Sequence, residues 1–279
     1  MKTNEQEHTL EEKKTETSKI SSHRIIHLLL STICLCVFLG CIVYLGNYFL
    51  KAKRSQDNVK SIKDMILTDS SESTEEPEFI DVNGRLVQKK YSELYEANPD
   101  FIGWITIPDT KVDYPVMQHM EENEYYIDRN FEQEYDASGL PFLDVQCSFT
   151  EPTDNMLIYG HNMKAGTMFS GILSYNSQDF YENHKSFTFN TIDGDGEYEV
   201  IAAFYSQVYP MEDTEHFKYY QFFDAASEEE FNAYVEQVKA LTPYEIDATA
   251  KYGDSLITLS TCAYHTEDGR FAVVARKIE

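Results

Sequence analysis

Cysteine is scarce in most of this sequence. Three of the five cysteines, Cys34, Cys36 and Cys41, lie in one apolar run, which leaves Cys147 and Cys262 for the rest of the 279 residues. These are too few for a disulfide framework, and the lack of any Cys-x-x-Cys pair argues against structural zinc. A single Cys147–Cys262 disulfide is conceivable, but two isolated thiols are the preferred interpretation, one of them a candidate reactive group.

Basic residues are also few, since 23 Lys and Arg stand against 48 Asp and Glu, for a formal net charge of −25. Such a chain repels a polyanion, so nucleic acid is not an expected partner. The simplest interpretation of the charge is a solubilising acidic surface. The alternative is that acidic residues attract a substrate that carries an amine.

The sequence lacks the motifs that bind common cofactors. No glycine-rich loop precedes a helix, which argues against a nucleotide, and no cluster of metal ligands stands out. The segment Asp-Gly-Asp-Gly-Glu at 193–197 lacks the spacing of a calcium loop and predicts a hairpin turn instead. We therefore expect neither a cofactor nor a bound metal.

Charged residues are absent from one long segment. Residues 25–50 contain no Asp, Glu, Lys or Arg and are almost wholly apolar. Because about 20 such residues cross a bilayer core, they predict a transmembrane helix. A removable signal peptide is the alternative, since Phe-Leu-Gly-Cys at 38–41 loosely matches a lipoprotein cleavage site. The apolar run continues beyond Cys41 to Leu45, which favours a retained helix.

The length of the chain predicts one domain with appended segments. Residues 1–24 are polar and predict a tail, and residues 51–80 begin basic, end acidic and Ser-rich, and predict a stalk or linker. Residues 81–279 then form the folded domain, and 20 Tyr and 17 Phe in the chain are enough for a sizeable core. Basic residues flank the apolar run on both sides, so their count does not orient it in a membrane. They are Lys13, Lys14, Lys19 and Arg24 before it, and Lys51, Lys53, Arg54, Lys60 and Lys63 after it.

Short runs of β-forming residues predict a mostly-β domain. Strands are expected at 101–107, 139–145, 155–159, 196–208, 255–261 and 270–278. A short helix is expected at 91–95, and a longer one after Ser227, which forms a capping box with Glu230. Apolar residues then repeat at helical spacing at Phe231, Tyr234, Val235 and Val238. Many short strands with one long helical insertion predict a barrel or sandwich that carries helices.

Cys262 ends the apolar, β-branched run 255–262 and is followed by a polar segment. A thiol at the end of a strand is held by the sheet and is open to a cleft, which is where scaffolds place reactive groups. A buried structural cysteine is the simpler interpretation of any lone cysteine, and Cys262 by itself does not outweigh it.

A nucleophilic cysteine needs a partner for proton transfer. His161 follows the strand-like residues 156–159 and Gly160, so it occupies a strand-end position like that of Cys262. His265 is three residues from the thiol and is not excluded by its position. Its polar surroundings are nevertheless typical of a surface residue, as are those of His119, His184 and His216. The remaining histidines, His8, His23 and His27, lie in the tail or the apolar run.

A developing oxyanion needs a donor, and Arg270 is the candidate. It begins the last predicted strand directly after the loop that leaves Cys262, so a hairpin there would return the guanidinium to the thiol. An ordinary charge on an edge strand is the alternative interpretation. Arg276 alternates to the same face of that strand and is the competing arginine.

The combination of these segments is more specific than any one of them. Residues 258–262 read Thr-Leu-Ser-Thr-Cys, Arg270 follows eight residues later, and Tyr-Gly-His-Asn-Met lies about a hundred residues upstream at 159–163. This ordered set resembles the sortase family over roughly residues 88–279. Other segments are similar to class B sortases, namely 98–105, 112–118, Asn123 with Tyr125 and Tyr126, 161–164, 167–169 and the helical insertion between 207 and 244.

The resemblance implies a closed eight-stranded β-barrel with N-terminal helices and a long helical insertion before the catalytic strand, preceded by one transmembrane helix. It implies that Cys262 attacks a Thr carbonyl in a C-terminal sorting signal to form a thioester. An amine, usually from the peptidoglycan cross-bridge or its precursor, then forms a new amide. His161 would be the general acid and base, and Arg270 would hold the substrate and its oxyanion.

The resemblance also implies substrate contacts and a location. Ser260 and Thr261 would line the cleft, and Asn123 and Tyr126 would help to bind the sorting signal. Ala263 departs from the acidic residue that often follows the cysteine in class B sequences, which puts the sorting-signal preference in doubt. The partners would be sorting-signal-bearing surface proteins and the membrane, in a single-pass cell-membrane protein with a cytoplasmic N-terminus and an extracellular catalytic domain.

Three other interpretations remain open. A pilus-polymerising sortase would use a pilin Lys as the amine, although residues 75–83 are short and hold no evident aromatic plug for a lid. A cysteine protease would pass the acyl group to water. An inactive membrane-tethered binding module would keep the fold, but loss of the Cys, His or Arg would be its mark, and none is lost.

Overall fold

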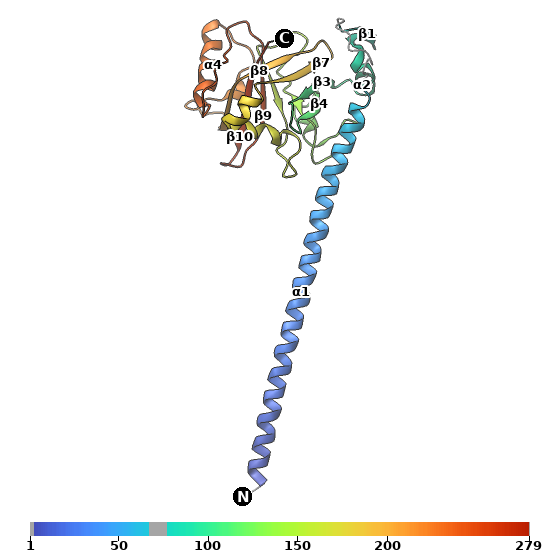
Figure 1. The fold of residues 1–279 in the computed structure, drawn as a ribbon, viewed down its shortest axis with the longest axis vertical. Helices are drawn as coiled ribbons and strands as arrows, with labels where there is room; N and C mark the ends of the chain where they lie inside the picture. Colours follow the sequence, from blue (N-terminus) through green and yellow to red (C-terminus); the bar gives the residue numbers. More distant parts are fainter. Residues whose placement is uncertain (1–2, 67–76, 279) are drawn as a thin grey trace. The chain divides into compact units, whose positions relative to one another are not determined.

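The computed structural model describes residues 3–66 and 77–278, with side chains from residue 26 onward. The chain divides into two compact units, Met1–Lys51 and Ala52–Glu279, and the long helix α1 (Thr3–Lys63) contributes to both (Figure 1). Within α1, residues from Ile26 form one helical segment that is long and apolar enough to cross a membrane, and none of its most apolar stretch is buried in protein. The transmembrane helix predicted at 25–50 overlaps this segment from residue 26 to residue 50.

The last turns of α1 belong to the second unit. Ala52, Ser55, Val59 and Ile62 are buried at spacings of three and four residues, so one face of the helix packs into that unit. Gln56 Nε2 also donates to the Tyr114 hydroxyl at 2.9 Å. This part of the predicted linker is therefore helical with a buried face, and residues 67–76 of the linker lie outside the described residues.

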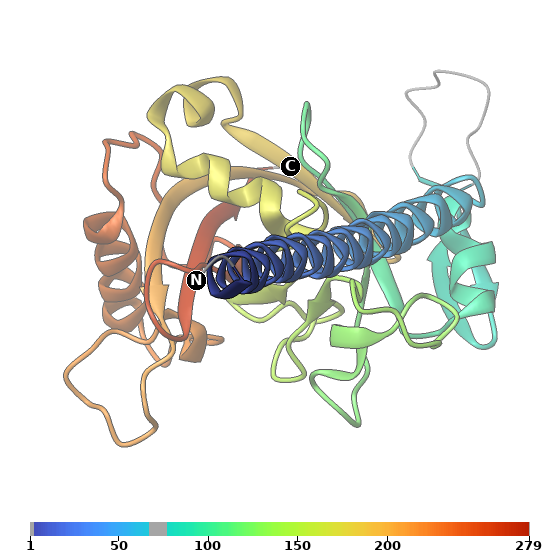
Figure 2. The ribbon, with the colours of Figure 1, turned by 90° about the horizontal axis from the view of Figure 1, so that it is seen from below.

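A closed barrel of eight strands forms the centre of the second unit (Figures 1 and 2). The order of its strands is β10-β8-β7-β3-β4-β5-β6-β9. Its strands are β3 (Phe101–Thr106), β4 (Asp113–Met117), β5 (Phe142–Leu143), β6 (Asn155–Tyr159), β7 (Ser186–Thr191), β8 (Glu197–Gln207), β9 (Leu256–Cys262) and β10 (Gly269–Lys277). Two pairs, β4–β5 and β6–β9, are parallel, and the other neighbours are antiparallel. The predicted mostly-β barrel is confirmed.

Two barrel strands were not predicted. β4 contains Pro115, which removes a ladder donor and argues against a strand in a sheet interior. The structure accommodates it because β4 meets β5 only at Met117, so the second edge of β4 needs no ladder bond beside Pro115. The second missed strand, β7, has the alternation typical of a strand, since Phe187 and Phe189 are buried and their neighbours are less buried. The predicted strand at 139–145 is reduced to the two residues of β5.

Helices surround the barrel. They are η1 (Lys89–Tyr91), α2 (Ser92–Ala97), η2 (Tyr125–Asp128), η3 (Phe169–Asn176), α3 (Gln178–Asn183), η4 (Tyr219–Gln221) and α4 (Glu228–Leu241). Half of the predicted capping box of α4 is present, since Ser227 Oγ accepts from Glu230 N at 3.3 Å. The Glu230 carboxylate accepts from Ala226 N at 2.8 Å, one residue before the N-cap. The four predicted apolar residues of α4 are buried, and the helix packs beside β8 (Figure 2).

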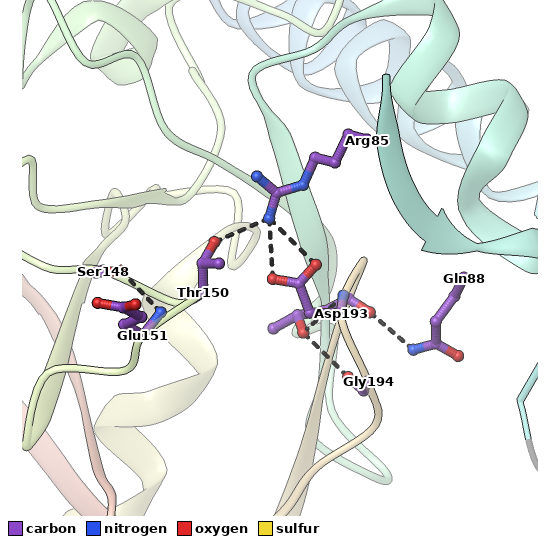
Figure 3. A network of polar contacts seen from close by, with 8 residues as sticks. Arg85, Gln88, Ser148, Thr150, Glu151, Asp193 and Gly194 are labelled. Atoms are coloured by element: carbon purple, nitrogen blue, oxygen red, sulfur yellow. Dashed lines mark hydrogen bonds and ion pairs between the residues drawn. The ribbon is translucent and has the colours of Figure 1, made fainter. Parts of the chain in front are cut away.

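A small hairpin, β1 (Phe79–Val82) and β2 (Arg85–Gln88), is attached to the β7–β8 turn by polar contacts (Figure 3). The Arg85 guanidinium donates to both oxygens of Asp193, at 3.1 and 2.9 Å, and to Thr150 Oγ1 at 2.8 Å. Gln88 Nε2 donates to the Thr191 carbonyl at 2.8 Å. The turn predicted at 193–197 therefore joins two strands and also holds the N-terminal hairpin.

Buried phenols are expected to make the fold sensitive to alkaline pH. Burial raises the pKa of Tyr219 to about 12, and it also raises the pKa of Tyr91, Tyr159, Tyr175, Tyr198 and Tyr234. Because these groups bind protons more tightly when folded, stability should be retained below the unfolded phenol pKa of about 10 and fall above it.

We expect the free energy of unfolding to drop between pH 8 and pH 11, by on the order of 1 kcal/mol for Tyr219 alone. Urea unfolding of the full chain in detergent micelles at the two pH values measures this change. An unchanged urea midpoint would show that the phenols are hydrated in the folded state.

Candidate active site

The hairpin of β9 and β10 brings Cys262 and Arg270 together. Cys262 is the last residue of β9 and is half-buried. Arg270 is the second residue of β10, and the antiparallel register places it directly opposite Cys262. Directly opposed residues of antiparallel strands have Cβ atoms roughly 4.5–5.5 Å apart. The predicted hairpin return of Arg270 is thus observed.

His161 is held at the same end of β9 by the parallel strand β6. Beyond the β6–β9 pairing, Gly160 N donates to the Ser260 carbonyl at 3.1 Å, and Thr261 Oγ1 donates to the Gly160 carbonyl at 2.7 Å. Asn162 Nδ2 donates to the Cys262 carbonyl at 2.9 Å. The residues on both sides of His161 are therefore bonded to the segment that carries the thiol.

Gly160 is required by a close approach of the next helix. A Cβ atom at this position would lie 2.6 Å from the ring of Phe169, which is the first residue of η3 and is fully buried. A larger residue would push either Phe169 or the His161 loop away. The glycine in the Tyr-Gly-His-Asn-Met motif therefore lets Phe169 pack against the loop, and this packing helps to position the histidine.

A cavity of ≈ 290 Å³ joins the three predicted catalytic side chains. Cys262, His161 and Arg270 all line it. The remaining lining residues come from η2, β5, β6, β9, η4 and the segments beside them, and from the residue after β8. They are Asn123, Glu124, Ile127, Leu140, Phe142, Tyr159, Gly160, Val208, Tyr219, Tyr220, Ser260 and Thr261. One cavity therefore presents a thiol, an imidazole and a guanidinium to the same volume.

Three of the four predicted substrate-binding residues line this cavity, and Tyr126 does not. Its side chain is buried, its hydroxyl donates to Asp100 Oδ2 at 2.9 Å, and it accepts from Asn98 Nδ2 at 2.9 Å. Asn123 lines the cavity while its amide is engaged on both sides. Its Nδ2 donates to Asp144 at 3.2 Å, and its Oδ1 accepts from Val145 N at 3.0 Å.

The His161 ring is oriented by a backbone carbonyl. Its Nε2 lies 2.7 Å from the carbonyl oxygen of Ile127, in η2. A carbonyl oxygen only accepts, so Nε2 carries a hydrogen in both the neutral and the charged ring. Nδ1 is then the nitrogen that gains or loses the second proton.

The two arginines of β10 differ in their partners. Arg276 donates to the Glu199 carboxylate at 3.0 and 2.8 Å, a structural ion pair between neighbouring strands. Arg270 donates only to backbone carbonyls among the described residues, Asp268 at 3.3 Å and Gly269 at 3.1 Å. The guanidinium in the cavity is thus not neutralised by a described carboxylate.

Ser260 contacts a phenol that sequence reasoning missed. Tyr219 is buried in η4, and its hydroxyl lies 2.7 Å from Ser260 Oγ, which is also buried. Because burial raises the pKa of Tyr219 to about 12, this hydroxyl keeps its proton at neutral pH. The insertion between 207 and 244 was expected to be helical, but nothing in its sequence marks Tyr219 as a cavity residue.

The other described histidines of this unit lie outside the cavity lining. The exposed His265 packs its ring on Tyr205 with centroids 4.7 Å apart. His119 and His216 pair with Asp100 and Asp213, each at 2.8 Å, and His184 stacks on Phe180 with centroids 3.9 Å apart. His119 and His184 are partly buried, which differs from the surface position expected for them.

Cys147 is a buried structural thiol. It forms no disulfide, its Sγ accepts from Leu157 N at 3.3 Å, and it donates to the Asn155 carbonyl at 3.5 Å. Burial raises its pKa to about 12. The interpretation of Cys147 and Cys262 as two isolated thiols is confirmed.

We expect iodoacetamide at pH 8 to label Cys262 and to spare Cys147 in the folded chain. With a pKa of about 12, Cys147 has only about one thiolate in 10⁴ at that pH. Peptide mass mapping of the full chain in detergent micelles, before and after denaturation in urea, measures both sites. Equal labelling of the two thiols before denaturation would contradict the burial of Cys147.

Metal-ligating residues do not gather in the described part of the chain, which holds no group of three or more His, Cys, Asp or Glu placed to hold a metal ion. A thiol, an imidazole and a cationic donor in one cavity form the set needed for acyl transfer through a covalent intermediate.

Known proteins share both the sequence and the fold. A family model described as "Sortase domain" matches residues 105–278. The chain is 32% identical to sortase B of Listeria monocytogenes over 199 residues, which cover 71% of this chain and 77% of that protein. It is 29% identical to sortase B of Staphylococcus aureus over 195 residues, which cover 69% of this chain and 76% of that protein.

Among solved structures, sortase B of Bacillus anthracis in complex with AAEK1 superposes with a TM-score of 0.69 at 26% identity, covering 83% of this chain and 99% of that one. A Staphylococcus aureus sortase B–substrate complex superposes with a TM-score of 0.69 at 25% identity, covering 82% of this chain and 99% of that one.

Proposed function

Because this chain belongs to the sortase family and is a class B cysteine transpeptidase, we propose that it acts on secreted proteins through a thioester at Cys262. It cleaves a C-terminal sorting signal and joins the new carboxyl end to a cell-wall peptidoglycan amine. The observation that supports this most directly is the one cavity lined by Cys262, His161 and Arg270.

In the first half-reaction, the Cys262 thiol gives its proton to His161, and its Sγ forms a bond to the carbonyl carbon of the scissile Thr in the sorting signal. The peptide C–N bond breaks, and His161 gives a proton to the leaving nitrogen. The developing oxyanion is stabilised by Arg270, whose guanidinium is permanently charged and donates hydrogen bonds.

In the second half-reaction, an amine attacks the thioester carbonyl. The C–S bond breaks, the thiolate of Cys262 leaves, and His161 accepts the proton that the amine nitrogen loses. The contact between Nε2 and the Ile127 carbonyl supports Nδ1 as the nitrogen for both transfers.

The substrate contacts proposed for Asn123, Ser260 and Thr261 are supported by their places in the cavity lining. Tyr126 is buried and does not line the cavity, so its proposed effect on the sorting signal acts through the segment it supports. The partners are therefore a sorting-signal peptide and an amine, and both must reach the same cavity.

We also propose that residues 25–50 anchor the enzyme in the cell membrane as a single span, with residues 1–24 in the cytoplasm and residues 81–279 outside. The apolar, unburied stretch of α1 supports the span. An outward-facing domain suits substrates that are secreted proteins and cell-wall amines.

Intact mass spectrometry tests this function. The full chain in detergent micelles is mixed with candidate sorting-signal peptides, with and without oligoglycine, lysine or diaminopimelate-type amines. A covalent adduct that an amine converts into ligated peptide is the expected result. An adduct that is only hydrolysed with every amine would indicate a protease, and no adduct with any peptide would indicate an inactive module.

A further inference from the structure

One carboxylate in the cavity has no part in the steps above. Glu124 lines the same cavity as Cys262, His161 and Arg270 and is exposed. Its carboxylate forms no hydrogen bond or ion pair with the residues that the structure describes, whereas nearby acidic residues such as Asp128 and Asp144 have partners. It is therefore a negative charge available to something that enters the cavity.

The backbone around Glu124 is fixed on both sides. The preceding residue, Asn123, is bonded to Asp144 and Val145, and the Glu124 carbonyl accepts from Ile127 N at 3.0 Å at the start of η2. The carbonyl of Ile127 in turn holds Nε2 of His161 at 2.7 Å. The charge of Glu124 thus sits on the short segment that orients the imidazole, while Arg270 enters the cavity from β10.

We propose that Glu124 selects the second substrate, resting on the function proposed above. Its carboxylate attracts the ammonium form of the incoming amine and holds it on the His161 side of the cavity. The amine class that it favours is a primary amine with no carboxylate beside it, such as the N-terminus of a glycine peptide. A neighbouring carboxylate on the amine would be repelled by Glu124.

The chemistry requires the amine to change its charge before it reacts. An ammonium attracted by Glu124 loses one proton to water and becomes the free amine, which forms a bond to the thioester carbonyl carbon. The C–S bond breaks to release the Cys262 thiolate, and His161 accepts the second proton that leaves the nitrogen. Water, the competing nucleophile, is uncharged and gains nothing from Glu124, so the carboxylate raises aminolysis relative to hydrolysis.

The partition of the thioester between the two nucleophiles measures this effect, because both products come from the same intermediate. The full chain and its variants react with a sorting-signal peptide and triglycine amide, and the ratio of ligated to hydrolysed peptide is read by mass spectrometry. An exposed charge pair predicts a ratio about threefold lower for Glu124→Gln and about tenfold lower for Glu124→Lys. One molar salt should lower the ratio of the unmodified enzyme toward that of Glu124→Gln.

Two controls separate charge from structure. Hydroxylamine is uncharged at neutral pH, so its ratio of aminolysis to hydrolysis should stay constant across the Glu124 variants. Glu96→Gln removes the same charge from the exposed end of α2, away from the cavity lining, and should leave the triglycine amide ratio unchanged. In Glu124→Gln, the ratio of aminolysis to hydrolysis with a diaminopimelate-type amine should rise relative to the ratio with triglycine amide.

The proposal is overturned by an unchanged ratio in Glu124→Lys, by an equal loss with hydroxylamine, or by an equal loss in Glu96→Gln. If no thioester forms in the unmodified chain with any peptide, the proposed function fails and the inference fails with it. A thioester that partitions without regard to charge overturns the role of Glu124 alone, so the two failures are distinguishable.

Discussion

Cys262→Ala is expected to abolish both the thioester adduct and the ligated product, with a loss of turnover of at least about a thousandfold. No other thiol of the second unit can replace it, because the one other cysteine there, Cys147, is buried and its pKa is raised to about 12. Intact mass after incubation with peptide and amine measures the loss.

The fold should survive this change. Cys262 is half-buried at the end of β9, so removing its sulfur leaves no large cavity and should change the free energy of unfolding by less than about 1 kcal/mol. Unfolding by urea checks this directly, so that lost activity is not mistaken for lost structure.

Cys147→Ala is the matched control, since it removes a sulfur of the same size from the interior. It should keep its adduct and ligation product while losing about 1 kcal/mol of stability with the two backbone contacts of the thiol. If Cys262→Ala still formed a covalent adduct, or if Cys147→Ala lost it, the assignment of the nucleophile would be wrong.

The central part of the site could be predicted because it is local in sequence. Cys262 and Arg270 lie on adjacent strands joined by a short loop, and the alternation of a strand fixes which of its residues face the same side. The β-branched run before Cys262 and the capping box of α4 are likewise patterns within a few residues. Such local patterns can be recognised in a single sequence.

The rest of the cavity depends on contacts between distant segments. Ile127 contributes a backbone carbonyl, which every residue has, so its sequence identity carries no sign of its contact with His161. Tyr219 meets Ser260 across 41 positions, through a helical turn inside a long insertion. Neither periodicity nor a short motif predicts such contacts, because they form only when the barrel closes.

Tyr126 shows that a segment can be assigned to the cavity correctly while the residue chosen within it is wrong. It lies in a segment that does border the cavity, yet its own side chain turns into the interior and bonds to Asp100 and Asn98. Its neighbours Glu124 and Ile127 line the cavity instead. In a short 3₁₀ helix the facing residue changes at every step, so a segment can be placed correctly while the residue within it is not.

Arg270→Lys should slow thioester formation by about a hundredfold, although it keeps the positive charge. Arg270 donates to two backbone carbonyls with one nitrogen, which leaves the other donors of its planar fork for the substrate. A lysine is a single flexible point charge and cannot reproduce that geometry. Loss of one oxyanion donor typically costs about 10²–10³ in rate.

Arg276→Lys is the matched control on the same strand. Its guanidinium is used by Glu199, so this variant should change the free energy of unfolding by about 1 kcal/mol or less and leave thioester formation intact. Both rates are measured as adduct appearance by rapid quench and intact mass.

A full rate in Arg270→Lys would mean that charge alone suffices at this position, and the oxyanion would then need donors from the backbone of β9 or the His161 loop. A large loss in Arg270→Lys with none in Arg276→Lys would instead tie the rate to the fork opposite Cys262, which is what the register of β9 and β10 leads us to expect.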